Sequence, residues 1–568
     1  MRRQRSAPAL AARTIITLLA AAGGTVMGFA VTLAIVVAKA RAGSYIFALE
    51  DLVEFRWEVI PVLIGPVAGF LLGLRHPNAL DRATVWGLCA MLLGVGSGIL
   101  LGGLFWGGGE GRWAGGIIFG ALGMAGGGIA SIRPVRDLDV HLSAGARGTL
   151  ILLAFAVFVT IGLTNLIQIE PLDLRPSEVV PVPEPSDVDA VVFLLGDGGA
   201  AERGRSPLLD ALRAHVEWWS KELARDSAVS VVYLGDVVYP DGVRDREHPG
   251  FAQDSAHLWD QVKLIGGPNA ATHGTVGLFL AGNHDWGNIS GAAGLERVMN
   301  LSEQLTRARS AGYHVALLPA AGEPGPVARD LRRNVRLVFL DTHWFLQARS
   351  APEREEFFVR VRQLLHEAGE REVIFVAHHP YYSAGPHGIV IPGYHTGGIA
   401  YMLKQSGTLV QDLNSPVYEG LLAHMRAIFE TSRKPPLVFA GGHDHSLQVL
   451  TGAGDFDPRF VLVSGAGSKL SSIRMVPGLV WGAARPGYMV LVFRKDDGVD
   501  LFVVAGDVKY LECAGARAEL RACMSAGTGA FQVVYSRTLL GAGKAPVPIT
   551  LRTARARWAR DRSRRPRT

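Results

Sequence analysis

Seven short runs of apolar, largely β-branched residues set the strongest limit on how this chain can fold. Each run ends in a polar or glycine-rich turn, which is typical of a buried strand. The runs read VDAVVFLLGD, AVSVVYLGD, GTVGLFLAGNHD, NVRLVFLDT, EVIFVAHHP, PPLVFAGGHDH and RFVLVSG. Helical patterns lie between them at about residues 208–224, 295–309, 353–368 and 418–431, and a hairpin turning at 496–498 follows. This alternation predicts an α/β domain.

Side chains that can carry chemistry lie directly after five of these strands. They are Gly-Asp-Gly-Gly at 196–199, Gly-Asp-Val-Val-Tyr at 235–239, Gly-Asn-His-Asp at 282–285, His-His-Pro at 378–380 and Gly-His-Asp-His at 442–445. Each motif alone is weak, because aspartates cap helices and glycines make turns. Loops at strand ends converge on one edge of a layered α/β fold. Gathered oxygen and imidazole donors would be costly to bury unpaired, so the series predicts two metal ions.

The order and spacing of these motifs, over about residues 190–450, resemble the calcineurin-like metallophosphoesterase superfamily, and the details resemble its purple acid phosphatase branch. Most of the superfamily begins with Asp-x-His, whereas this chain has Gly199 at the histidine position. Purple acid phosphatases share that gap and fill it with a tyrosine three residues after the second aspartate, here Tyr239. The stretches HHPYYSAGPHG and GHDHSLQ extend the resemblance. It implies a four-layer α/β/β/α sandwich.

Carried over residue by residue, the resemblance implies two sets of metal ligands that share Asp236. The first set is Asp197, Asp236, Tyr239 and His445, and the second is Asp236, Asn283, His378 and His443. The cofactors would be Fe(III), which suits a phenolate donor, and a divalent ion (Fe, Zn or Mn). Two such ions can bind phosphoryl oxygens and lower the pKa of a bound water, which then attacks as hydroxide.

Two further histidines match residues that bind the phosphoryl group and help to protonate the leaving oxygen in the resembled family. They are His284 in GNHD and His387 in GPHG. A purely structural role for His387 stays open, because its match depends on a loop of undefined length.

The first part of the chain predicts a different environment. Uncharged apolar stretches at 14–38, 59–74, 83–109, 113–132 and 148–167 are long enough for transmembrane helices, although the second could be re-entrant or interfacial. The expected fold class is therefore an α-helical transmembrane bundle of about five spans (residues 1–169) followed by the α/β domain (188–510). A proline-rich linker at 170–187 would separate them.

The basic residues flanking these stretches predict a multi-pass protein of the plasma (inner) membrane with its catalytic domain exported. A C-terminal extension (511–547) and a basic, disordered tail (548–568) would follow that domain. Cys513 and Cys523 are candidates for a disulfide, with free thiols as the alternative. The net charge of +6 is not accompanied by a nucleic-acid-binding motif, so the bilayer is the expected partner and nucleic acid is not.

The expected function is hydrolysis of phosphate monoesters outside the cytoplasm, with a phosphorylated small molecule or lipid as substrate. Diesterase or pyrophosphatase activity on nucleotide or lipid-linked substrates is the alternative, since one dinuclear site serves several such chemistries. A transporter or sensor with a regulatory phosphoesterase-like domain is an alternative of another class. The sequence makes no prediction of oligomeric state.

Overall fold

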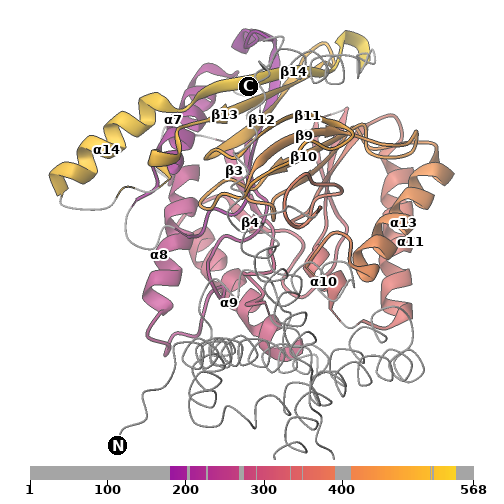
Figure 1. The fold of residues 1–568 in the computed structure, drawn as a ribbon, viewed down its shortest axis with the longest axis horizontal. Coiled ribbons are helices and arrows are strands. Elements are labelled where there is room, and N and C mark those ends of the chain that lie inside the picture. Colours follow the sequence, from indigo (N-terminus) through magenta and orange to yellow (C-terminus); the bar gives the residue numbers. More distant parts are fainter. Residues whose placement is uncertain are drawn as a thin grey trace, which may run out of the picture. The chain divides into compact units, whose positions relative to one another are not determined.

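The computed structural model describes residues 180–200, 205–224, 228–267, 274–288, 291–332, 334–347, 349–389, 411–511, 513 and 517–544. These residues belong to one compact unit, made of Ile169–Tyr394 and Gln411–Thr568. Two seven-stranded sheets form its centre (Figure 1).

The first sheet has a parallel half and an antiparallel half. Its strand order is β14 (Gln532–Leu540), β13 (Val499–Ala505), β12 (Gly487–Arg494), β1 (Val188–Leu195), β2 (Ala228–Tyr233), β3 (Thr275–Phe279), β4 (Val315–Leu317). The last four strands run parallel, so their carboxyl ends lie at one edge. The β12–β13 hairpin is the one predicted to turn at 496–498.

The second sheet also has a parallel centre. Its strand order is β11 (Leu479–Ala483), β9 (Leu447–Thr451), β10 (Phe460–Ser464), β8 (Val438–Gly441), β7 (Glu372–Val376), β6 (Val335–Phe339), β5 (Val327–Arg332). Strands β10, β8, β7 and β6 are parallel. The carboxyl ends of β7 and β8 carry three of the predicted metal ligands.

Alternation along each strand places its side chains in different layers. Ala190, Val192 and Leu194 of β1 belong to the core shared with the second sheet, whereas its remaining apolar residues face helices. Those helices are α7 (Pro207–Glu222), α8 (Phe251–Val262) and α9 (Gly291–Ser310). On the second sheet, Phe375 of β7 packs against Phe429 of α13 (Pro416–Ser432), with ring centroids 5.4 Å apart. Helix α11 (Ala351–Ala368) lies beside α13 in Figure 1.

Helix starts follow ordinary capping chemistry. The Ser206 side chain accepts from Leu209 N at the start of α7, and Ser350 and Glu353 form a capping box at the start of α11. Two further helices of the described residues are α10 (Thr342–Leu346), which follows β6, and α14 (Arg517–Ala530), which precedes β14.

The predicted transmembrane helical architecture is wrong. The described residues form a mixed α/β domain with two sheets. No helix among the described residues is both long and apolar enough to cross a membrane. The two longest of them, α9 and α11, are amphipathic and carry glutamates and arginines along their exposed faces. The same finding overturns the predicted multi-pass membrane localisation with an exported domain. The predicted spans at 14–38, 59–74, 83–109, 113–132 and 148–167 lie outside the described residues.

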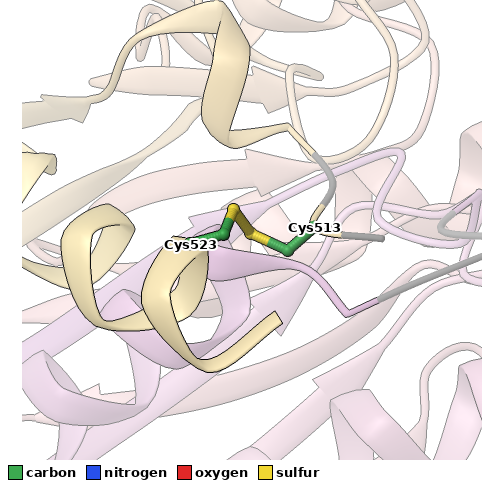
Figure 2. Close-up of a disulfide and its surroundings, with 2 residues drawn as sticks. All are labelled: Cys513 and Cys523. Carbon is green, nitrogen blue, oxygen red and sulfur yellow. A yellow bond between two sulfur atoms is a disulfide. The ribbon is translucent and has the colours of Figure 1, made fainter. Parts of the chain in front are cut away.

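The first sheet extends beyond residue 510, where the sequence placed the end of the α/β domain. Strand β14 pairs with β13, and the Ser536 hydroxyl bonds both backbone groups of Val180. Cys513 and Cys523 are joined by a disulfide that links α14 to the segment before it (Figure 2). Cys513 also exchanges two backbone hydrogen bonds with Arg205, just ahead of α7. Residues 517–540 are therefore tied into the domain rather than appended to it.

Candidate metal centre

The predicted ligands meet where strands of both sheets end. Asp197 follows β1, Asp236 and Tyr239 follow β2, and Asn283 follows β3 in the first sheet. From the second sheet, His378 follows β7 while His443 and His445 follow β8. All seven residues are buried.

One group of donors surrounds the Tyr239 hydroxyl. Its oxygen lies 3.0 Å from Asp197 Oδ1, 3.0 Å from Asp236 Oδ2 and 3.2 Å from His445 Nε2. His445 Nε2 is in turn 3.5 Å from Asp197 Oδ1. These are the four residues expected to hold the first metal.

A second group shares Asp236 with the first. His378 Nε2 lies 3.4 Å from Asp236 Oδ2 and 2.8 Å from Asn283 Oδ1. His443 Nδ1 lies 3.1 Å from the same Asn283 oxygen and 3.2 Å from His378 Nε2. Asp197, Asp236 and His378 each offer one ligand atom within 4.8 Å of the others, a spacing that could hold a metal ion.

The two histidines of this second group present lone pairs rather than protons to one another. His378 Nδ1 lies 2.8 Å from the Leu234 carbonyl, and His443 Nε2 lies 2.9 Å from the Gln411 carbonyl. A carbonyl can only accept, so those nitrogens carry the hydrogens and donate them. In the neutral rings, His378 Nε2 and His443 Nδ1 are then acceptors 3.2 Å apart.

Asn283 adds a third acceptor. Its amide nitrogen donates to Asn288 Oδ1 at 2.7 Å, which directs its own oxygen toward both imidazoles. With the Asp236 carboxylate, four acceptor atoms then converge in a buried space. A cation satisfies such a set, whereas a hydrogen-bond network of acceptors alone does not. The residues therefore fit a bound metal ion.

Backbone conformation at the ligands is unusual. Asp197, Asp236 and His443 have φ values of +59°, +54° and +66°, in the left-handed region that side chains with a Cβ rarely adopt. Each of these residues lies two or three positions after the end of a strand, where the chain turns. Such conformations persist only where surrounding contacts enforce them, and they gather at functional sites.

Gly199 has a steric reason to lack the histidine found in most of the resembled superfamily. A Cβ there would collide with the carbonyl group of Val237, in the turn that carries Tyr239. The Gly199 carbonyl also accepts from Tyr239 N at 3.2 Å. The missing histidine and the tyrosine are thus linked by direct packing of two backbone segments.

Asp285 braces the loops that carry the ligands. Its carboxylate accepts from Val237 N, Val238 N and Gly282 N at 2.9–3.2 Å. Burial, followed by the negative charge of Asp236, raises the pKa of Asp285 to about 8. Burial and the Asp236 charge thus disfavour a second negative charge at this edge unless a cation is bound there.

Each of the two predicted catalytic histidines lies beside one of the donor groups. His284 Nδ1 is 2.7 Å from the Pro240 carbonyl, and the ring centroid lies 4.3 Å from that of Tyr239. The His387 ring centroid lies 4.0 Å from that of His443. Both rings are buried against the candidate ligands.

Three residues near the site were missed in the sequence. Lys469 Nζ lies 3.9 Å from the Tyr239 ring centroid, while Gln411 and Asp412 contact site histidines. None belongs to a recognisable motif, and the last two follow residues 390–410 rather than a strand. His379, next to His378, bonds Thr342 Oγ1 and Gln411 Oε1, and burial lowers its pKa well below the ordinary value.

No protein-family profile matches this chain, and no curated protein matches it. Among solved structures, the chain is similar to GAP50, the anchor in the inner membrane complex of Plasmodium. Sequence identity is 14%, the match covers 66% of this chain and 94% of that one, and the TM-score is 0.39.

Two other solved structures are similar to this chain with the same TM-score. The purple acid phosphatase PPD1 from yellow lupin (Lupinus luteus) seeds is 15% identical, with 66% of this chain and 58% of that one covered and a TM-score of 0.39. PhoD is 11% identical, with 58% and 68% covered and a TM-score of 0.39. Similarity at this level does not carry a functional assignment, which depends on the chemistry of the site itself.

Proposed function

We propose that this domain is a dinuclear-metal hydrolase of phosphate esters, with monoesters as its first substrate class. The observation that carries the proposal is the cluster of acceptors from Asp236, Asn283, His378 and His443, beside the cluster around Tyr239. Asp236 belongs to both clusters, so one carboxylate can bridge two ions. When bound, such a pair of ions supplies Lewis-acid polarisation of the phosphoryl group and an activated water.

The chain's own residues then account for binding and orientation. His284 is held by its Nδ1 contact with the Pro240 carbonyl, so Nε2 is the nitrogen that would meet a phosphoryl oxygen. His387, on the other side, is proposed to assist departure of the leaving oxygen. The phosphorylated substrate, a small molecule or a lipid, would bind between them.

Tyr239 supports a more specific proposal about the metals. In a bound site, its oxygen lies close enough to Asp197, Asp236 and His445 to act as an anionic ligand beside them. A hard phenolate donor favours trivalent iron, so we assign Fe(III) to this group. A divalent ion (Fe, Zn or Mn) is assigned to the group with His378 and His443.

The decisive experiment uses the full chain. Purified protein should contain close to two metal ions per chain, absorb visible light through the Tyr239–iron bond, and hydrolyse p-nitrophenyl phosphate faster than bis-p-nitrophenyl phosphate. Chelator treatment should abolish activity, and added metal should restore it. Faster diester or pyrophosphate hydrolysis would move the assignment to those substrates.

A matched pair of variants controls for folding. Asp236→Asn keeps the shape of a bridging residue and should remove activity, because it removes the charge that both clusters share. Asp500→Asn changes another buried aspartate, on β13, that bonds Thr538 at 2.7 Å and belongs to neither cluster. It should keep activity. Folded protein that binds no metal and hydrolyses none of these esters would overturn the proposal.

A further inference from the structure

Gln411 and Asp412 lie directly ahead of α13 and form part of the wall of the candidate site. Both side chains are buried, at 1% and 2% exposure. Backbone bonds hold the pair in place, because Leu413 N donates to the His387 carbonyl at 3.0 Å and Ser415 N donates to the Asp412 carbonyl at 2.9 Å. These bonds fix the position of Gln411 and Asp412 relative to His387.

Gln411 fixes the orientation of His443 through its main chain. Its carbonyl accepts from His443 Nε2, which places Nδ1 toward Asn283 and His378. Its side-chain oxygen also lies 2.9 Å from His379 Nε2. Gln411 thus contacts two adjacent imidazoles, one through its main-chain carbonyl and the other through its side-chain oxygen.

Asp412 fixes the neighbouring ring, that of His387, with its hydrogen on Nδ1, whereas His443 carries its hydrogen on Nε2. Asp412 Oδ1 lies 3.0 Å from His387 Nδ1, with both side chains at most 6% exposed. A carboxylate accepts, so Nδ1 carries a hydrogen whether the imidazole is neutral or cationic. Nε2 is therefore the nitrogen of His387 that can exchange a proton with a ligand.

A second bond holds the backbone of His387. Its N–H donates to Asp444 Oδ1 at 3.1 Å, and Asp444 sits between the two candidate ligands His443 and His445. The ring then lies against that of His443, at 4.0 Å between centroids. Backbone and side chain are thus anchored by two different carboxylates, and the Asp412 contact determines the ring nitrogen that keeps its hydrogen.

We propose that Asp412 is a positioning residue that holds His387 with Nε2 directed at the leaving-group oxygen of a bound phosphate ester. The proposal rests on the proposed function and deepens it. Carboxylates that orient a functional histidine in this way commonly change activity by about 10–100-fold when they are removed. The carboxylate of Asp412 bonds the His387 ring, so its effect on activity passes through that ring.

The test is a double-variant cycle measured on two substrates. Asp412→Ala, His387→Ala and the double variant are assayed on p-nitrophenyl phosphate, which has a good leaving group, and on glycerol phosphate, which has a poor one. Asp412→Ala should lower kcat about tenfold or more on glycerol phosphate and less on p-nitrophenyl phosphate. In the His387→Ala background, the same substitution should cost almost nothing further, because residues that act as a unit are non-additive.

Controls separate positioning from folding and from metal loss. Asp412→Asn is close in shape and should retain the thermal unfolding midpoint, while Asp500→Asn, at a buried aspartate outside the site, should retain kcat. Metal content should be unchanged in every Asp412 variant. Additive losses in the cycle, equal losses on the two substrates, or loss of metal from Asp412→Asn would each overturn the inference.

Failure of the underlying function gives a different result. Wild-type protein that hydrolyses neither ester would overturn the proposed function and this inference together. Active wild-type protein with an additive cycle overturns the role of Asp412 alone.

Discussion

The phenol oxygen of Tyr239 lies 3.0 Å from Oδ1 of Asp197, although 42 residues separate the two in the chain. The contact joins the ends of β1 and β2, which are parallel neighbours in the first sheet. It places a phenol oxygen directly among the carboxylates of the first donor group. The identity of the metal in this group should therefore depend on Tyr239.

Replacement of Tyr239 by phenylalanine should weaken the first donor group alone. We expect Tyr239→Phe to lose metal from that group, to lose any visible absorption, and to lower kcat at least about tenfold, the lower bound for residues that support ligands. Metal-to-protein ratio and the visible spectrum are the measurements. Tyr233→Phe is the control, because the Tyr233 hydroxyl donates to the Gln261 carbonyl instead. Unchanged colour and metal content in Tyr239→Phe would reject the assignment.

Asp457 should contribute more to the stability of the domain than Arg426, with which it forms an ion pair. The buried carboxylate accepts from Arg426, Tyr381 and Tyr382, and from two backbone amides. We expect Asp457→Asn to lower the free energy of unfolding by about 2–3 kcal/mol, because several buried donors lose a charged acceptor. Arg426→Ala should cost about 1 kcal/mol or less, since the Arg426 side chain is 51% exposed. Denaturant unfolding of both variants checks this, and equal losses would contradict it.

Much of this fold was predictable because its strands are short and apolar, and each ends in a polar or glycine-rich turn. The strand-end aspartates and histidines could be grouped from their positions in the chain, since parallel strands bring their carboxyl ends together. The pairing of β14 with β13 could not be predicted, because it depends on register between segments rather than on a motif. Helix α8 was missed because half of its sequence, FAQDSAHLWDQV, is polar and its apolar residues do not form a long regular pattern.

The residues that contact the candidate ligands and the predicted catalytic histidines were harder to predict than the ligands themselves. Asp412 reaches His387 across 25 residues, and nothing in the sequence LVQDLNSP marks it as a site residue. The transmembrane expectation failed for another reason. It rested on the composition of residues 1–169, which lie outside the described residues, and none of the described helices is long and apolar enough to cross a membrane.

Asp341 should make stability fall as pH rises through the weakly acidic range. Burial raises its pKa to about 6, even though its carboxylate accepts from Trp344 N and Trp286 Nε1. An unfolded aspartate ionises near pH 4, so between about pH 4 and 6 the folded state holds a proton that the unfolded state has lost. Rising pH therefore removes about 3 kcal/mol of stability, and no more above pH 6.

Asp341→Asn isolates this effect. Asparagine does not titrate, so the stability of the variant relative to wild type should improve between about pH 4.5 and pH 7. Thermal unfolding midpoints of both proteins at the two pH values give the comparison. A constant difference would mean that Asp341 keeps an ordinary pKa.

The disulfide should stabilise the domain through the short loop that it closes. Cys513 and Cys523 are 10 residues apart, and a loop of this length corresponds to about 3 kcal/mol in the chain-entropy description. We expect Cys513→Ser with Cys523→Ser to lower the unfolding midpoint. Reductant should lower the wild-type midpoint to the same value and leave the double variant unaffected. A wild-type midpoint that is insensitive to reductant would argue against the contribution.

The left-handed backbone at Asp197, Asp236 and His443 carries a conformational cost of about 1 kcal/mol or more at each position. Glycine would relieve that cost, but it would delete a candidate metal donor. At the two aspartates it would also leave buried donors such as the Tyr239 hydroxyl, His284 N and His443 N without their acceptor. The strain is therefore held in place by the same bonds that build the site, and a more stable variant should be sought by substitutions elsewhere in the domain.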